Sequence, residues 1–425
     1  MHSKTTLSSG LRVLTESTPG TQSVTALVLV KAGSRWEDAR INGISHFLEH
    51  MFFKGAKKYL SPKAVSEAID AVGGEFNAFT GKEYAGYYVK LAATHATLAL
   101  DVLSDMLLHA RFDEAEIEKE RGVIKEEFNM YQDTPMYQVA WDFERALFGD
   151  QPLGWDEIGT KEIIDRLSRE DFVTYKEALY VPENMVLCLS GAVEHEQVVA
   201  WAEQFFPMQK TPVARQMLAF DADLAPGKRV HLTTKKTEQS HLVFGVRAVP
   251  AEHPDYYAGK VLSAVLGGNM SSRMFQAVRE DKGLAYYIST GVEGYLDAGT
   301  MYTRAGVNVD KIDDAVQAIL EEYARVKTEL IPAEELKKGK EFLKGKLTLA
   351  MEDSEHVAQM LAEHELLYGK IESFEEIAKQ LDAVTAEDVQ RIAQSWLTDE
   401  ALHLAVIGPY EDAERFAKLL PSSGL

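Results

Sequence analysis

The sequence predicts an α+β fold made of two homologous domains of about 200 residues each. Two observations predict it. Near the start of each half, an apolar strand (residues 24–30 and 240–248) is followed by a short loop and a helix. Near the end of each half, residues 180–191 and 396–408 share an apolar strand and a glycine. A repeated order of elements indicates a duplicated unit, and two unrelated domains with a similar order are the alternative.

The length of 425 residues also favours more than one domain, because a single hydrophobic core rarely serves so long a chain. We place the boundary in residues 211–227, where periodicity is weak and Pro212 and Pro226 occur. This linker separates an N-terminal domain, residues 1–210, from a C-terminal domain, residues 228–425.

Local patterns place the elements along the chain. Ser61 and Pro62 are typical of a helix start, and Gly73 of its end. The predicted strands of the first domain are residues 11–14, 24–30, 75–80, 84–91 and 184–193. Its predicted helices are residues 44–53, 61–72, 95–110, 113–131 and 194–206. In the second domain, helices are predicted at residues 256–266 and 271–281.

The composition excludes some classes of function. The formal net charge of −21 argues against a nucleic-acid partner, whose phosphates favour a basic surface. No apolar run approaches the roughly 18 residues of a membrane span, and the N-terminus lacks the features of a signal or transit peptide. The single cysteine, Cys188, lies in an apolar run and is expected to be a buried structural thiol. These features predict a cytoplasmic protein with no membrane contact.

The segment with the most chemistry is the helix at residues 44–53. His46 and His50 are four apart and therefore share one face, and Glu49 lies beside them. Two imidazoles at this spacing can bind one zinc ion, and a neighbouring carboxylate can accept a proton from a water molecule. The order His-x-x-Glu-His is that of the inverted zinc-protease motif. The alternative is an amphipathic helix with two surface histidines.

A zinc ion held by two histidines needs a third protein ligand, commonly a glutamate. The helix at residues 113–131 offers Glu120, Glu126 and Glu127. Glu120 and Glu127 are two turns apart and share a face, whereas Glu126 points about 100° away from Glu127. Spacing alone leaves all three open.

The second domain lacks a corresponding metal set. When the two halves are aligned, Leu262, Val265 and Leu266 take the places of the two histidines and the glutamate. His356 and His364 are eight apart and too distant to share one ion directly, so we interpret their segment as a charged helix face.

Three stretches now identify a resemblance. Residues 43–55, 73–80 and 120–127, together with the segment from Arg279 to Tyr286, resemble the pitrilysin-type inverzincin zinc peptidases. The nearest branch is that of the mitochondrial processing peptidases and their bacterial homologues. The resemblance covers essentially the whole chain. It implies two homologous domains, each a mostly antiparallel sheet packed with helices.

The resemblance also implies roles for individual residues. His46, His50 and Glu127 are expected to bind one Zn2+ per chain, with Glu49 as general base. Glu120 is expected to orient a metal ligand. Arg279 and Tyr286 are expected to contact the substrate and support the transition state. The expected substrate-binding residues are Asn77, Ala78 and Phe79 of an edge strand. From the residues alone, Arg279 and Tyr286 could be ordinary surface groups.

The function implied is a zinc endopeptidase that cleaves peptides or unfolded segments bound as an extended strand in a closed chamber. In shorter members of the family the arginine and tyrosine serve the metal site of a partner subunit, so a homodimer with active sites completed in trans is expected. The rival hypothesis is a non-catalytic peptide-binding or assembly subunit. Relatives of that kind typically lose part of the metal set, which is complete here.

Overall fold

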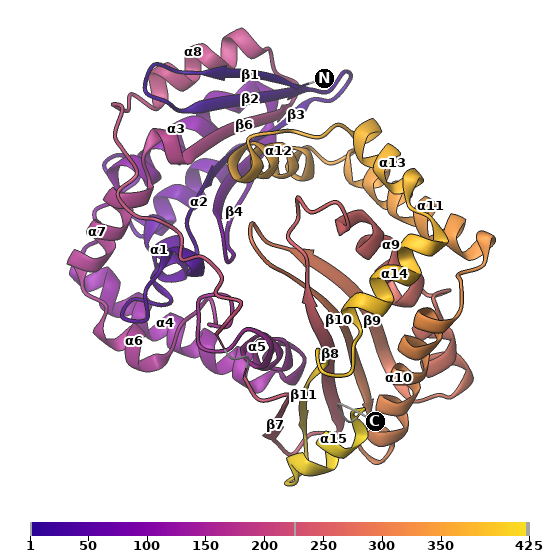
Figure 1. Ribbon diagram of the computed structural model, residues 1–425. Helices are drawn as coiled ribbons and strands as arrows, with labels where there is room; N and C mark the ends of the chain where they lie inside the picture. Colours follow the sequence, from indigo (N-terminus) through magenta and orange to yellow (C-terminus); the bar gives the residue numbers. More distant parts are fainter. Residues whose placement is uncertain (1, 225–226, 422–425) are drawn as a thin grey trace. The chain divides into compact units, whose positions relative to one another are not determined.

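The computed structural model describes residues 2–224 and 227–421. Within these ranges the chain forms two compact units, each with one β-sheet covered by helices (Figure 1). Unit 1 comprises Met1–Asn129, Asp156–Ala219 and Leu349–Ile371, and unit 2 comprises Met130–Trp155, Phe220–Thr348 and Glu372–Leu425. The predicted α+β fold is therefore confirmed.

The sheet of unit 1 has six strands in the order β1-β2-β6-β3-β5-β4. Only β2 and β6 run parallel to each other; every other neighbouring pair is antiparallel. The central strands β3 and β6 are almost entirely buried, as their apolar sequences predict. The strands are β1 (Ser3–Thr6), β2 (Arg12–Ser17), β3 (Ser23–Val30), β4 (Glu75–Thr80), β5 (Ala85–Ala92) and β6 (Met185–Gly191).

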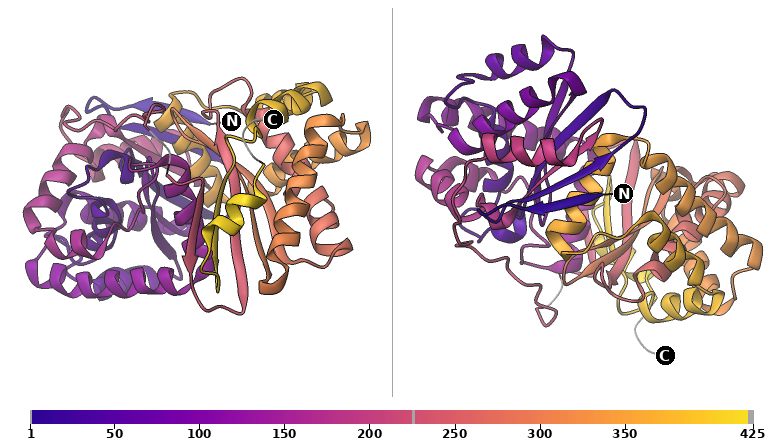
Figure 2. Two further views of the ribbon diagram at one scale, coloured as in Figure 1. Left: turned by 60° about the horizontal axis from the view of Figure 1, so that its bottom comes forward. Right: turned by 90° about the horizontal axis from the view of Figure 1, so that it is seen from above.

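The sheet of unit 2 repeats this topology. Its order is β7-β11-β8-β10-β9, with β7 and β11 parallel and the remaining pairs antiparallel. Strand β11, from near the end of the chain, lies between β7 and β8 (Figure 2). The strands are β7 (Val230–Thr234), β8 (Gln239–Ala248), β9 (Ala285–Gly294), β10 (Gly299–Asn308) and β11 (His403–Gly408). Apart from β1, the two sheets match strand for strand, as a duplicated unit requires.

Helices cover both faces of the sheet in unit 1. Helix α3 packs on β3 and β5, and α12 packs on the opposite face against β3 and β6 (Figure 1). The core under α12 includes Cys188, which is fully buried as predicted. The helices of unit 1 are α1 (Ile44–Phe52), α2 (Pro62–Asp70), α3 (Ala96–His109), most of α4 (Glu114–Asp133), α6 (Lys161–Arg166), α7 (Arg169–Leu179), α8 (His195–Phe205) and α12 (Ser354–Glu363).

In unit 2, helices α9, α10 and α14 build the main core on one face of the sheet, and α5 covers the other face. The helix predicted at residues 271–281 is a π-helix, η4 (Phe275–Asp281). The other helices of unit 2 are α5 (Pro135–Phe148), α9 (Tyr256–Gly267), α10 (Ile312–Thr328), most of α11 (Ala333–Ala350), α13 (Phe374–Ala383), α14 (Ala386–Trp396) and α15 (Ala413–Leu419).

The compact units do not follow the chain in two simple halves. Helix α5 belongs to unit 2 although it precedes residues 211–227, and α12 belongs to unit 1 although it follows them. Each sheet thus has one face covered by a helix from the other half of the sequence. The boundary at residues 211–227 stays a prediction about the duplicated sequence segments.

Candidate metal centre

Helix α1 presents the two histidines from a firmly packed apolar base. Ile44, Phe47, Leu48 and Met51 are at most 1% exposed and form the predicted stripe against the core. Gly43 begins the helix with a left-handed φ of 95°, and a Cβ there would meet the carbonyl oxygen of residue 158. Only glycine adopts this conformation easily.

A buried carboxylate fixes the start of α1. Glu37 is fully buried and accepts hydrogen bonds from the backbone N–H groups of Gly43 and Ser45, each at 2.8 Å. Asn42 Nδ2 donates a third at 3.0 Å. Burial raises the pKa of Glu37, and these donors act in the opposite direction. The carboxyl oxygens of Glu37 thus lie at the N-terminus of α1, where the helix dipole is positive, and this interaction stabilises the start of the helix.

Helix α4 supplies the acidic side chains. Ile117, Glu120 and Ile124 are its buried residues, and Glu127 continues the same row one turn later. Glu126 is exposed and lies off this face. The row therefore brings Glu120 and Glu127 to the histidines and leaves Glu126 in solvent.

Three side chains converge at one point. Nε2 of His46 lies 3.6 Å from Oε1 of Glu127, and Nε2 of His50 lies 3.4 Å from Oε2 of the same residue. One ligand atom from each residue lies within 4.8 Å of the others. Within residues 2–224 and 227–421, this is the one group of His, Cys, Asp and Glu side chains that could hold a metal ion.

The donor set fits zinc. Tetrahedral zinc binds nitrogen and oxygen ligands at about 2.0–2.2 Å, which places neighbouring ligand atoms roughly 3.4 Å apart. The two measured distances, 3.4 and 3.6 Å, are close to that spacing. Two imidazoles and one carboxylate also leave a fourth position open, as catalytic zinc sites do.

His50 is oriented through its second ring nitrogen. Its Nδ1 lies 2.8 Å from Oε1 of Glu120, a buried carboxylate whose other oxygen is 2.5 Å from Lys54 Nζ. This is the arrangement in which a carboxylate fixes the tautomer of a ligating histidine. His46 differs, since its Nδ1 is buried and no described residue pairs with it.

The carboxylates bias the protonation of the metal-free site. Burial lowers the pKa of His50, but hydrogen bonds to Glu120 and Glu127 and the charge of Glu49 outweigh it and raise the pKa to about 9. Burial raises the pKa of Glu127, yet hydrogen bonds from His46 and His50 hold that pKa well below its usual range. Without metal, His50 therefore carries a proton at neutral pH and Glu127 is ionised.

The predicted general base, Glu49, lies between the histidines and β4. Thr80, the last residue of β4, donates a hydrogen bond from Oγ1 to Oε2 of Glu49 at 2.6 Å. Phe76 of the same strand contacts Phe53 at the end of α1, with ring centroids 5.7 Å apart. One face of β4 is thus turned toward the helix that carries the motif.

The predicted substrate-binding residues Asn77, Ala78 and Phe79 lie in the middle of β4, which is an edge strand of its sheet. Asn77 is exposed, and the ring of Phe79 lies over Gly86 of β5. Their role in binding substrate stays a prediction.

Arg279 and Tyr286 belong to unit 2. The guanidinium of Arg279 stacks on the Phe275 ring at 4.5 Å, and 39% of this side chain is exposed. Tyr286, the second residue of β9, is 54% exposed. Both side chains are available to a ligand, and their catalytic role stays a prediction.

Sequence reasoning missed three residues around the site: Glu37, Lys54 and Thr80. Lys54 follows His50 by four residues, but α1 ends at Phe52, so helical spacing gives no reliable signal. Glu37 and Thr80 contact α1 from other segments of the chain, and no local pattern points to those contacts.

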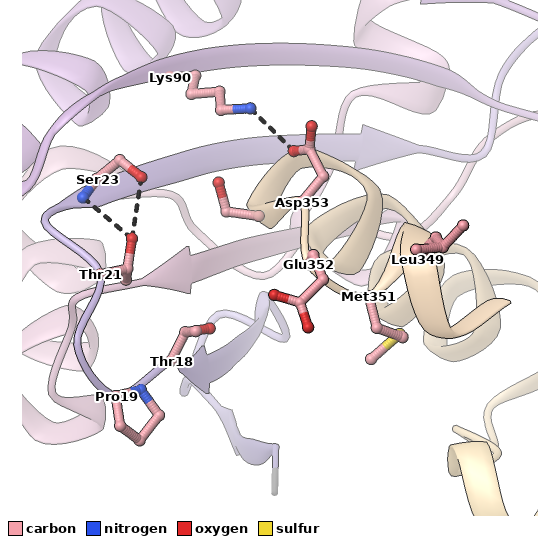
Figure 3. Close-up of a pocket in the computed structure, with 10 residues that line it drawn as sticks. Thr18, Pro19, Thr21, Ser23, Lys90, Leu349, Met351, Glu352 and Asp353 are labelled. Atoms are coloured by element: carbon pink, nitrogen blue, oxygen red, sulfur yellow. Dashed lines mark hydrogen bonds and ion pairs between the residues drawn. The ribbon is translucent and has the colours of Figure 1, made fainter. Parts of the chain in front are cut away.

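A separate cavity of about 540 Å³ lies in unit 1 between residues 18–23 and the start of α12 (Figure 3). Lys90 Nζ, from its lining, donates to Asp353 Oδ1 at 2.9 Å. None of the predicted site residues lines this cavity.

Comparison with known proteins identifies the family of the chain. The sequence profile described as insulinase (peptidase family M16) matches residues 12–161, and the one described as peptidase M16 inactive domain matches residues 166–343. A Bacillus subtilis protein named as an uncharacterized zinc protease is 37% identical over 95% of this chain and 97% of its own length. A Mycobacterium leprae protein with the same description is 35% identical over 98% of this chain and 94% of its own length.

The chain belongs to the M16 peptidase family. This confirms the pitrilysin-type resemblance of the motifs, and the names of the relatives support a zinc metalloprotease. The M16 fold is also shared with solved structures. A protease from Helicobacter pylori has a TM-score of 0.87 at 22% identity, covering 96% of this chain and 99% of that one. The profile described as inactive matches residues 166–343, and the described residues of that segment contain no group of side chains that could hold a metal ion.

No helix among the described residues is long and apolar enough to cross a membrane.

Proposed function

We propose that this M16 protein is a zinc-dependent endopeptidase that cleaves peptides or unfolded segments bound as extended strands. The observation that carries the proposal is the convergence of His46, His50 and Glu127 next to Glu49. Family membership and the names of the relatives support it.

The free edge of β4 is the proposed binding site for the peptide backbone. Strand β4 pairs with β5 on one side and ends the sheet on the other, so its outer N–H and C=O groups have no strand partner in the described part of the chain. An extended peptide can pair with such an edge through main-chain hydrogen bonds. Because Thr80 of β4 contacts Glu49, a peptide on this edge would lie near the general base.

Each residue then has a defined task. Zinc held by the three ligands would polarise the scissile carbonyl and a water molecule. Glu49 accepts a proton from the attacking water and delivers it to the leaving amine as the C–N bond breaks. Tyr286 donates a hydrogen bond to the oxyanion, and Arg279 contacts the peptide.

Cleavage of a quenched fluorescent peptide library tests the proposal. The purified protein should show cleavage that a chelator abolishes and zinc restores. Glu49→Gln should retain zinc and peptide binding but lose turnover, because an amide cannot accept the proton. The exposed neighbour Glu126→Gln is the matched control and should keep full activity. Substantial turnover by the Glu49 variant would sink the assignment, and no cleavage of any peptide would favour a non-catalytic binding subunit.

We also propose a cytoplasmic homodimer with one zinc per chain, in which Arg279 and Tyr286 of one protomer serve the metal centre of the other within a closed chamber. This arrangement follows from the resemblance to the processing peptidases. Co-expressed Glu49→Gln and Tyr286→Phe chains test it, after mass measurement in solution. Each hybrid dimer would contain one intact site, so about a quarter of wild-type activity should return. If the sites form within single chains, the mixture will stay as inactive as its parents.

A further inference from the structure

The carboxylate of Glu49 has one hydrogen-bond donor in the described part of the chain, and that donor is Thr80. The Oγ1 to Oε2 distance is 2.6 Å, which is within the usual range for a hydroxyl that donates to a carboxylate oxygen. The hydroxyl engages one carboxylate oxygen only. The other oxygen of Glu49 is left to exchange a proton.

The position of Thr80 is itself held firmly. The chain turns immediately after it, and backbone N–H groups of Ser34 and Arg35 donate to the carbonyl oxygens of Gly81 and Lys82 at 3.3 and 2.9 Å. The fully buried Arg35 pairs with Glu83 at 2.5 Å. These contacts anchor the end of β4 to the loop between β3 and α1. Thr80 is also β-branched, so its side chain has few rotamers available.

We propose that Thr80 is a positioning residue for the general base, acting from the strand on which the substrate is proposed to bind. Its hydroxyl fixes the orientation of the Glu49 carboxylate on α1. The inference rests on the proposed function for its catalytic consequence, but its structural content is independent of that function.

The location of Thr80 on β4 gives this contact a further consequence. A peptide that pairs with the edge of β4 would lie beside the strand that carries the hydroxyl. The base and the proposed peptide site are therefore held in register by one contact. Without this contact, a carboxylate on the partly exposed face of α1 would have to be ordered in each turnover.

Two substitutions separate the hydroxyl from the shape of the side chain. Thr80→Val keeps the β-branched shape and removes the donor, whereas Thr80→Ser keeps the donor. We expect kcat to fall about 10- to 100-fold in Thr80→Val, with KM and zinc content within about twofold of wild type. Thr80→Ser should retain activity within about threefold of wild type. Thr15→Val is the matched control and should leave kcat unchanged. Thr15 lies on β2 of the same sheet, and its hydroxyl bonds to His195 of α8.

Crystal structures of zinc-soaked Thr80→Val and Thr80→Ser provide the readout that does not depend on turnover. Glu49 should keep its rotamer in the serine variant and leave it in the valine variant. An unchanged rotamer in Thr80→Val, or an unchanged kcat in a variant without the hydroxyl, overturns the inference. If the wild-type protein cleaves no peptide, the proposed function fails and the crystal structures alone decide the role of Thr80.

Discussion

The affinity for zinc should rise about 50-fold between pH 7 and pH 9. The Nε2 atom of His50 must lose its proton before it can bind a metal, and the pKa of His50 in the metal-free site is about 9. At pH 7 only about one site in 100 has lost that proton, whereas at pH 9 about half have. The apparent affinity therefore weakens about fivefold between pH 9 and pH 8, and about tenfold for each pH unit below that.

Replacing Glu120 with glutamine changes this dependence in a defined way. The variant lacks the charge that helps to hold the proton on His50, so the pKa of His50 should fall toward its ordinary value and the pH dependence should flatten. It also loses the carboxylate that orients the ring, which weakens metal binding by about 10- to 100-fold for contacts of this kind. The loss should be fully visible at pH 9 and partly offset at pH 7.

Competition with a chromophoric zinc chelator across this pH range measures both effects, once the protonation of the chelator is taken into account. Glu126→Gln, at an exposed position on the same helix, is the matched control and should follow the wild-type curve. A wild-type affinity that is constant from pH 7 to pH 9 would refute the reasoning. So would a Glu120→Gln curve that is parallel to the wild-type curve.

Three further predictions concern stability. The metal-free protein should lose up to about 3 kcal/mol of stability as the pH rises from 6.5 to 9, because the raised pKa of His50 stabilises the fold only while the ring is protonated. Thermal unfolding in the presence of a chelator measures this loss. A stability that increases over this pH range would contradict the prediction. Gly86→Ala should destabilise unit 1 by about 1–3 kcal/mol in urea titrations, because the Cβ of the new alanine would lie 2.2 Å from the ring of Phe79. The control variant Gly122→Ala should not destabilise the protein, because there is open space around Gly122. Glu37→Ala should lower the free energy of unfolding by about 2–4 kcal/mol, because two buried N–H groups at the start of α1 lose their acceptor, and a change below about 1 kcal/mol would show that water replaces it.

The sequence was sufficient for the parts of the site that depend on local geometry. Helical spacing places His46 and His50 on one face, and the structure has them there, with ring centroids 4.8 Å apart. The same rule places Glu120 and Glu127 on one face of α4. It could not choose between Glu126 and Glu127, because a helix pattern does not say which face meets another helix. That choice is made by the packing of Ile117 and Ile124, because Glu127 lies on the same face of α4 as these buried residues and Glu126 does not.

The remaining parts depend on contacts between distant segments. Thr80 reaches Glu49 only because the β4–β5 turn is anchored to Arg35, which lies 45 residues earlier in the chain. Helices α5 and α12 show the same limit on a larger scale. A sequence pattern can identify the apolar face of each helix, but it does not say which sheet covers that face. Helix α5 packs on the sheet of unit 2 and α12 on the sheet of unit 1, so each packs on the sheet that is more distant in the sequence.

The duplicated fold shows why the candidate metal centre lies in one unit and has no counterpart at the aligned residues of the other. Strand order is the same in both, so the two helices α1 and α9 follow equivalent strands. On α1 the histidines are partly exposed, at 14% and 22%, which allows a ligand to reach them. On α9 the aligned residues Leu262, Val265 and Leu266 are at most 2% exposed and belong to the core of unit 2. Restoring a metal set there would place three polar groups in an apolar core without partners, which is strongly destabilising. Burial of α9 therefore closes that route, and any catalytic contribution of unit 2 has to come from side chains at its surface, where Arg279 and Tyr286 are found.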